Sequence, residues 1–550
     1  MVGFMPGGSE VPRSLGETGP PGETRATGGT RTPDHMTVAV IGAGASGTLA
    51  AVALLRADTA RALLIDLYET GAIAGRGVAY STTDPRHLLN VPAERMSMLA
   101  DEPDHLLRWA EGNALDLGRT GFLPRREYAC YLSDTLAAHA DDRLTLVPAE
   151  VVDIEAVPRH GSKARVTAGS VDAVAGASPG APGTYAVHTA PHRPGQHLAE
   201  HGARITRSAD VVVLAYGNLP PRPLEAAGVA LPDASWHVSD PWAPGALDDL
   251  PRAGDVLLVG TGLTAVDVAL TLLEASDGAS PGPPARRVIM TSRHGLLHRG
   301  HADLDAAPWP IAAPPGDGPL TAAAVHALVG AETARAAAAG VGWRAVIDGI
   351  RPITQQLWRR LPLSERRRFL DTEARDWEIH RHRMAPEVAA RVDALRGSGR
   401  LQVLAGRVAS VTPLREPEGV IDEARRTAPA TPLGEGCRVV VELPGGASAA
   451  YDVAAVVNCT GPLTDVGRSS RRLVSALLAR GLVRPDPLRL GVDVDEAGVV
   501  TGRAGSPVPG LFAVGPPRKG TLYETTAVPE IREQAHQLAQ TLVSRAMAAR

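Results

Sequence analysis

The sequence predicts an α/β protein in which one βαβ unit begins the chain and a second βαβ unit is inserted further along. Two glycine-rich turns predict this class, because each follows a short apolar run and precedes a run rich in Ala and Leu, within residues 37–68 and 255–291. A third observation is the Ala/Arg-rich, helix-patterned segment 319–397. We therefore expect two parallel-sheet domains and a helical insert.

The first unit opens with the apolar run 37–41, which is typical of a buried strand. The glycine-rich turn after it has the pattern G-x-G-x-x-G and comprises Gly42, Gly44, Ser46 and Gly47. Such glycines allow a tight turn, close approach of a pyrophosphate and close packing of helix on strand. The second strand, 62–68, ends at Glu69, where an acid accepts hydrogen bonds from ribose hydroxyls. We interpret this unit as a dinucleotide site; the alternative is a glycine-rich turn in a plain α/β protein.

The second unit has the strand 255–259 and then a G-x-G-x-x-A turn. The residues expected to hold a nucleotide there are Gly260, Gly262, Thr264 and Ala265. No acid stands at the end of its second strand, 287–291; Ser292 and Arg293 follow instead. An arginine at this place suits the 2′-phosphate of NADP better than a bare ribose. The alternative is an arginine that caps the sheet edge.

Composition narrows the class of protein. The chain has 550 residues, so several domains are expected. Its net charge is −4, so no polyanion such as nucleic acid is expected as a binding partner. Its three widely spaced cysteines indicate a reducing compartment, which we take to be the cytoplasm, and they exclude a C-x-x-C redox pair. The longest apolar run, 256–273, contains Asp267, so no membrane span is expected. No metal motif appears, and a homo-oligomer is compatible with the composition.

The domain organisation follows from the two units. Residues 1–35 hold eight glycines and five prolines and are expected to be a disordered N-terminal extension. The first nucleotide domain is expected at 36–245 and 463–550, the second at 246–318 and 398–462, and the helical insert at 319–397. The segment 167–183 reads as a surface loop. After each unit comes an apolar strand with a glycine close behind it, and the first of these is Gly217, where the chain can pass close to a bound cofactor.

Seven further stretches resemble one known family. They are GRGVAYST (75–82), DPRHLLNVP (84–92), GTGLTAVD (260–267), SRHGLL (292–297), DWEIHRHRMAP (376–386), VVNCTGP (456–462) and GPPRKGTLYETTAVPEIREQA (515–535). From about residue 36 to the C-terminus the chain resembles the FAD/NAD(P)-binding flavin N-monooxygenases that include nitrosuccinate synthase. This resemblance implies FAD and NADPH as cofactors, with the NADPH domain inserted in the FAD domain. It also implies O2 as co-substrate and the amine of L-aspartate as the group oxidised.

The resemblance also implies roles for individual residues. Gly42, Gly44, Ser46, Gly47 and Glu69 match the adenosine-diphosphate part of the FAD site. The part near the flavin ring is matched by Gly75, Arg76, Gly77, His87, Asn90 and Ser97. The C-terminal arm over FAD is matched by Gly515 and the Thr525-Thr526 turn. The NADPH site is matched by Gly260, Gly262, Thr264, Ala265 and Arg293. For His87 the residues alone leave a loop-bracing role open.

The motifs also limit the chemistry. Without a cysteine pair, an iron–sulfur cluster motif or a haem motif, reduced flavin must pass electrons to oxygen or to a small acceptor. Three functions stay open on this reasoning: an N-monooxygenase of a small amino acid, an NAD(P)H oxidoreductase or oxidase with another acceptor, and a flavin-based redox sensor.

An aspartate substrate requires cations for its two carboxylates. Two clusters qualify, 380–383 and 518–524. The candidate catalytic residues are His380, His382, Lys519 and Glu524. The candidate substrate-binding residues are Arg381, Arg383, Arg518 and Tyr523. Four consecutive helix positions point in different directions, so at most two of 380–383 are expected to face one pocket; the alternative is a solvated helix face. Either His380 or His382 could accept the proton of the substrate amine.

Overall fold

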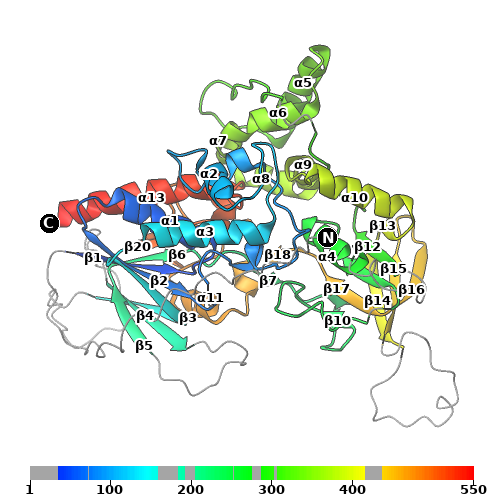
Figure 1. Ribbon diagram of the computed structural model, residues 1–550, viewed down its shortest axis with the longest axis horizontal. Helices are drawn as coiled ribbons and strands as arrows, with labels where there is room; N and C mark the ends of the chain where they lie inside the picture. Colours follow the sequence, from blue (N-terminus) through cyan, green and yellow to red (C-terminus); the bar gives the residue numbers. More distant parts are fainter. Residues whose placement is uncertain are drawn as a thin grey trace, which may run out of the picture.

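A computed structural model describes residues 35–71, 73–158, 184–191, 205–251, 253–274, 286–302, 306–414 and 436–550. Residues 1–34 of the predicted extension and the predicted loop 167–183 lie outside the described residues. The model confirms the predicted class, because two separate sheets each carry a βαβ unit with a glycine-rich turn (Figure 1).

The first sheet has eight strands in the order β19-β20-β6-β1-β2-β3-β4-β5. Its strands are β19 (Val499–Thr501), β20 (Pro507–Ala513), β6 (Val211–Leu214), β1 (Met36–Ile41), β2 (Leu63–Glu69), β3 (Leu144–Val157), β4 (Thr184–Pro191) and β5 (Ile205–Ala209). The five strands from β20 to β3 run parallel, whereas β4, β5 and β19 are antiparallel additions. Strand order thus brings the C-terminal segment beside the first βαβ unit.

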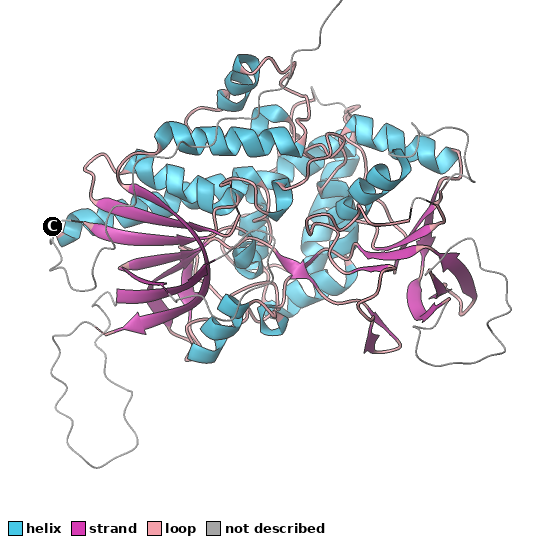
Figure 2. Cartoon of the chain, turned by 60° about the horizontal axis from the view of Figure 1, so that its bottom comes forward, coloured by secondary structure: helices cyan, strands magenta, loops and turns pink. Residues whose placement is uncertain are grey.

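Helices cover one face of this sheet (Figure 2). They are α1 (Ala45–Ala57), α2 (His105–Gly112), α3 (Arg125–His139) and α13 (Val528–Ala549). Leu54, Leu63 and Leu542 belong to the buried apolar cluster between helices and sheet. A second apolar cluster on the other face includes side chains of α11 (Arg472–Arg480).

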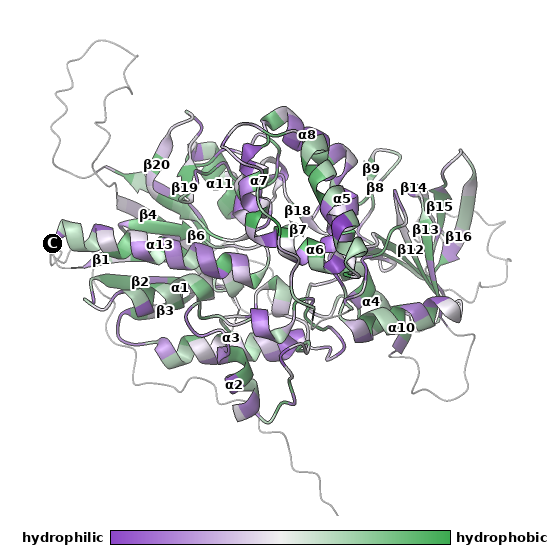
Figure 3. Ribbon diagram, turned by 90° about the horizontal axis from the view of Figure 1, so that it is seen from above, coloured by the Kyte–Doolittle hydropathy of each residue, from purple (hydrophilic) through white to green (hydrophobic). Residues whose placement is uncertain are grey.

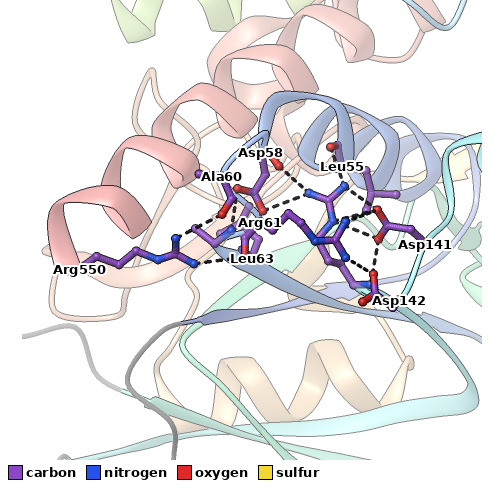
Figure 4. Close-up of polar contacts among 10 residues, drawn as sticks. Leu55, Asp58, Ala60, Arg61, Leu63, Asp141, Asp142 and Arg550 are labelled. Atoms are coloured by element: carbon purple, nitrogen blue, oxygen red, sulfur yellow. Dashed lines mark hydrogen bonds and ion pairs between the residues drawn. The ribbon is translucent and has the colours of Figure 1, made fainter.

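A buried network fixes the connection from α1 to β2 (Figure 4). Asp58, 1% exposed, accepts hydrogen bonds from the backbone N–H groups of Ala62 and Leu63, both at 2.8 Å. The guanidinium of Arg143 donates to the carbonyl of Asp58 at 2.6 Å and so ties the turn to the start of β3. Because β2 begins at Leu63, this network positions the strand that ends at Glu69.

The second sheet has five parallel strands in the order β10-β17-β11-β12-β13. They are β10 (His237–Val238), β17 (Ala455–Asn458), β11 (Val256–Val259), β12 (Val288–Ser292) and β13 (Leu401–Ala405). Helices α4 (Leu263–Glu274) and α10 (Pro386–Gly397) pack on it. Beside it lies the antiparallel sheet of β14 (Arg407–Pro413), β15 (Cys437–Glu442) and β16 (Ser448–Val453). The domain boundaries stay a prediction, and β10 lies before the predicted boundary at residue 246.

Two short strands join the domains where the chain crosses between them. Strand β7 (Leu219–Pro221) pairs with β18 (Pro462–Leu463), and Figure 1 shows them between the two larger sheets. A small hairpin, β8 (Glu225–Ala226) and β9 (Val229–Ala230), follows β7.

The segment predicted as a helical insert is helical. It contains α5 (Ala322–Ala338), α6 (Trp343–Ile350), α7 (Thr354–Arg360), α8 (Leu363–Thr372) and α9 (Ala374–Arg381). Seen from above, α5 to α8 lie between α13 of the first domain and α4 and α10 of the second (Figure 3). Helix α10 also lies within the predicted range 319–397, but it packs on the second sheet. The short helix α12 (Lys519–Leu522) meets α7 there. Among the described helices, none has the length and apolar character needed to cross a membrane.

Candidate active site

A cavity of about 810 Å³ opens at the carboxyl ends of β1 and β2, where ligands bind in parallel sheets. The first glycine-rich turn forms part of its wall through Gly42, Gly44 and Ser46. Gly42 has φ of 100°, and a Cβ there would lie 2.9 Å from the carbonyl oxygen of Ala215, so this turn requires glycine. Gly47 has a packing role, since its Cβ would lie 1.8 Å from the carbonyl oxygen of Gly42.

The geometry of the turn fits a pyrophosphate. Helix α1 starts after Gly44 without a side-chain cap, so its first N–H groups remain available to an anion. A Cβ on Gly44 would lie 3.3 Å from the Cα of Gly77, whose loop lines the same cavity. Because neither glycine carries a side chain, a phosphate can approach both backbones closely. We call this space, between Gly44 and Gly77, the phosphate cradle; a larger residue at either position would fill it.

Glu69 occupies the position expected of a ribose-binding acid. It ends β2 and lines the cavity. Its Oε2 accepts a hydrogen bond from the N–H of Ala43 at 3.1 Å, and its Oε1 accepts one from Gly71 at 2.8 Å. These bonds orient the carboxylate and leave lone pairs for a ribose.

The remaining residues predicted near FAD divide into two groups. Arg76, Gly77, His87 and Gly217 line the cavity. The others do not line it: the N–H of Gly75 donates to Ala43, the carbonyl of Asn90 pairs with His301, and the hydroxyl of Ser97 donates to the carbonyls of Leu99 and Glu102. Gly515 packs on Ser46, and the hydroxyl of Thr525 donates to the carbonyl of Gly515 at 2.9 Å.

His87 connects the two domains. It is 3% exposed, and its Nε2 lies 2.9 Å from the hydroxyl of Thr271 and 3.0 Å from the carbonyl of Asp267, both on α4. Its Nδ1 lies 2.7 Å from the hydroxyl of Thr82. With both ring nitrogens in hydrogen bonds, the loop-bracing role left open by the sequence is the one that the contacts favour.

The second glycine-rich turn also requires glycine. Gly260 has φ of 130°, and a Cβ there would lie 2.1 Å from the carbonyl oxygen of Cys459. Gly262 faces open space, Thr264 is half-buried and Ala265 is buried in the first turn of α4. Arg293, directly after β12, is exposed and makes no ion pair with any described residue. These positions fit a nucleotide that carries phosphate near β12.

The cluster 380–383 does not lie on one helix, contrary to the expectation of four consecutive helical positions. Helix α9 ends at Arg381, and the two arginines point to different partners. Arg381 lies 3.3 Å from Glu524 and 3.4 Å from Glu530, whereas Arg383 lies 2.5 Å from Asp348. Both are buried in existing ion pairs, so a carboxylate clamp made by this pair, as predicted, is disfavoured.

The two histidines of this cluster differ. His380 is held on its own helix, with Nδ1 2.8 Å from the carbonyl of Asp376. His382 keeps some accessible surface, yet protein surrounds it; burial, with repulsion from Arg381 and Lys519, lowers the pKa of His382 to about 3. A histidine with so low a pKa is a poor acceptor for the proton of an amine, which disfavours the predicted role of His382.

The C-terminal arm, residues 515–526, contains the other predicted residues. Arg518 is buried, and its guanidinium donates to the carbonyl of Glu496 at 2.8 Å. Tyr523 stacks on Trp358 with ring centroids 4.6 Å apart and its φ is 59°, a strained value for a non-glycine residue. Lys519 lies 5.7 Å from the ring centroid of Tyr523 and, among the described residues, makes no ion pair.

Several residues that make contacts in this region were not identified from the sequence. Arg351 donates to Glu530 at 2.8 Å, and Gln355 donates to the carbonyl of Glu524 at 2.9 Å. Arg375 reaches the second glycine-rich turn. Each contacts a residue that is distant from it in the sequence, so only the tertiary fold identifies these contacts. The described residues contain no group of three or more His, Cys, Asp or Glu side chains that could hold a metal.

Comparisons with known proteins agree with this arrangement. Residues 39–176 match the family model described as FAD-NAD(P)-binding, in agreement with the predicted cofactors. The structure is similar to ornithine hydroxylase (PvdA) from Pseudomonas aeruginosa, with a TM-score of 0.56, 16% identity, and 93% of this chain and 99% of that chain covered. It is also similar to FAD-bound DfoA from Erwinia amylovora, the cadaverine monooxygenase of the desferrioxamine pathway, with a TM-score of 0.56, 11% identity and 94% of each chain covered. No curated protein matches the sequence. The chain therefore has the two-domain dinucleotide-binding fold of these monooxygenase structures along nearly its whole length.

Proposed function

We propose that the chain is an FAD- and NADPH-dependent N-monooxygenase of a small amino acid, with L-aspartate as the first substrate to test. One observation carries the proposal. The cavity with the phosphate cradle and the ribose acid belongs to a fold that is shared, over more than nine-tenths of the chain, with an ornithine hydroxylase and a cadaverine monooxygenase. Bound FAD would supply the electron transfer from NADPH to oxygen. Glu69 and the turn around Gly44 would hold it.

The buried cysteines disfavour thiol chemistry. Burial raises the pKa of Cys437 to about 12 and the pKa of Cys459 further still, so neither forms the thiolate that disulfide exchange requires. Cys130 lies on α3 and is distant in sequence from both.

Lys519 is the cation we propose for a substrate carboxylate. The chain has two lysines, Lys163 and Lys519, and the latter is the one described. Arg351 and Arg381, its neighbours at the junction of insert and arm, are already paired with Glu530 and Glu524. Lys519 is half-buried and pairs with no carboxylate of the described part of the chain. Three residues before it, Pro516 lines the cavity. An incoming carboxylate would supply the missing counter-charge.

A screen of amino acids and diamines tests the function. Purified chain loaded with FAD is expected to consume NADPH faster with its substrate and to form an N-oxidised product. Lys519→Met is expected to raise the KM for a carboxylate-bearing substrate at least about tenfold, since one charge-assisted bond is lost. NADPH consumption that yields only hydrogen peroxide with every amine would identify an oxidase and refute the proposal.

A further inference from the structure

A cation of the helical insert reaches the nucleotide turn of the second domain. Arg375, the second residue of α9, donates from Nη2 to the hydroxyl of Thr261 at 3.1 Å and also to the carbonyl of Leu296. Thr261 is the middle residue of the Gly260–Gly262 turn, and Leu296 follows the end of β12. One guanidinium therefore spans the carboxyl ends of β11 and β12, where the adenosine half of a nucleotide binds in this type of domain.

The charge at this point is positive. Arg293 lies one residue after β12 and has no ion-pair partner among the described residues. Burial lowers the pKa of Arg375; Glu378 opposes this effect, and repulsion from Arg293 adds to it. Among the described carboxylates, the one that Arg375 approaches is that of Glu378, at 4.0 Å. The positive charges of Arg375 and Arg293 repel each other, and the distant carboxylate of Glu378 compensates them poorly. A bound anion would therefore stabilise this pair of guanidinium groups.

The donors match a phosphate monoester. A phosphate oxygen accepts charge-assisted hydrogen bonds from a guanidinium. In Arg375, Nη2 already donates to Thr261 and Leu296 and Nη1 lies 4.0 Å from Glu378, so Nε is the donor without a partner among the described residues. The hydroxyl of Ser292 lies at the same edge, 2.9 Å from that of Thr261. No acid ends β12 to compete for this position.

We infer that Arg375 of the insert, together with Arg293, binds the 2′-phosphate by which NADPH differs from NADH. The inference rests on the NADPH use in the proposed function, but not on amine oxidation. On this inference the helical insert is part of the nucleotide site. The selectivity for NADPH over NADH then depends on the insert, through Arg375, and on the second domain, through Arg293.

Direct binding to the FAD-loaded full chain tests this inference. The probes are adenosine 2′,5′-bisphosphate and 5′-AMP, which differ in the 2′-phosphate. For the unmodified chain we expect the bisphosphate to bind more tightly. Arg375→Met is expected to weaken the bisphosphate about 10- to 100-fold and AMP by less than about twofold, and Arg293→Met is expected to do the same. Arg375→Lys keeps the positive charge but loses the guanidinium geometry. Its affinity for the bisphosphate is expected to lie between those of the unmodified chain and Arg375→Met.

Arg368 is the matched control, because it is an exposed arginine of the same insert that ends no strand and contacts no nucleotide turn. Arg368→Met is expected to leave both affinities unchanged. If Arg375→Met and Arg375→Lys weaken both probes equally, Arg375 is only a strut between α9 and the turn, and the inference is wrong. It is also wrong if the unmodified chain does not distinguish the probes. A chain that prefers the bisphosphate but oxidises no amine would refute the proposed function and leave this inference standing.

Discussion

At the scale of single residues, the site depends on positions where a side chain cannot be accommodated. Gly44 and Gly77 approach each other so closely that a Cβ on either would lie 3.0–3.3 Å from the Cα of the other. This contact forms the phosphate cradle. At the same scale, a clamp made of Arg381 and Arg383 is disfavoured, since each already pairs with an acidic side chain.

Gly44→Glu is expected to abolish FAD binding, because the new side chain would occupy the pyrophosphate position and repel its charge. Flavin absorbance per mole of purified protein measures the effect. Gly118→Glu is the control, since nothing lies within 4 Å of a Cβ placed there, and it is expected to keep its flavin. A yellow Gly44→Glu protein with full flavin content would contradict the placement of the cradle.

At the scale of elements, α9 connects both candidate sites through opposite faces. Trp377 and Arg381, four residues apart and so on one face, contact Glu524 of the arm, at 3.1 and 3.3 Å. Arg375 lies on another face and contacts the nucleotide turn. The arm and the turn are therefore held by one short helix.

Glu530→Gln is expected to weaken the docking of the insert on α13. Glu530 is the acceptor for Arg351 at 2.8 Å and lies 3.4 Å from Arg381, and these side chains are 7–14% exposed. Loss of the charge leaves the nearly buried Arg351 without its counter-ion and Arg381 with Glu524 alone, which costs about 3 kcal/mol. Limited proteolysis of the insert and the free energy of unfolding are the measurements. Glu533→Gln, on the exposed side of the same helix, is the control, and equal effects of both changes would contradict this role.

At the scale of the whole molecule, three histidines lie where the insert rejoins the second domain. Burial is the main cause of their low pKa values, which are about 3 for His298, about 4 for His301 and about 3 for His382. Backbone bonds join the two segments, from Met384 to Arg299 and from His301 to Met384. All three rings are neutral at pH 7 and at pH 5.

Stability is therefore expected to fall as the pH drops below about 6.5, the ordinary pKa of histidine. Between that pH and about 4, the unfolded chain binds protons that the folded chain does not, at about 1.4 kcal/mol per pH unit for each histidine. Urea unfolding between pH 7 and pH 5 measures the slope. His301→Gln should reduce it, while His326→Asn, an exposed histidine of α5, should not. An unchanged slope in His301→Gln would contradict the assignment.

The sequence by itself determined the two βαβ units, because strand, turn and helix are local patterns and the glycine spacing carries the phosphate chemistry. It also placed Gly44 and Gly260 in the two turns and Glu69 at the end of a strand. The tertiary structure alone decided which charged side chains are free. Arg381, Arg383 and Lys519 look equivalent as cations in the sequence, but Glu524 and Asp348, which neutralise two of them, come from elements that are distant along the chain. For the same reason Arg375 became visible only once α9 was seen against the nucleotide turn, since charge pairing depends on distance in space.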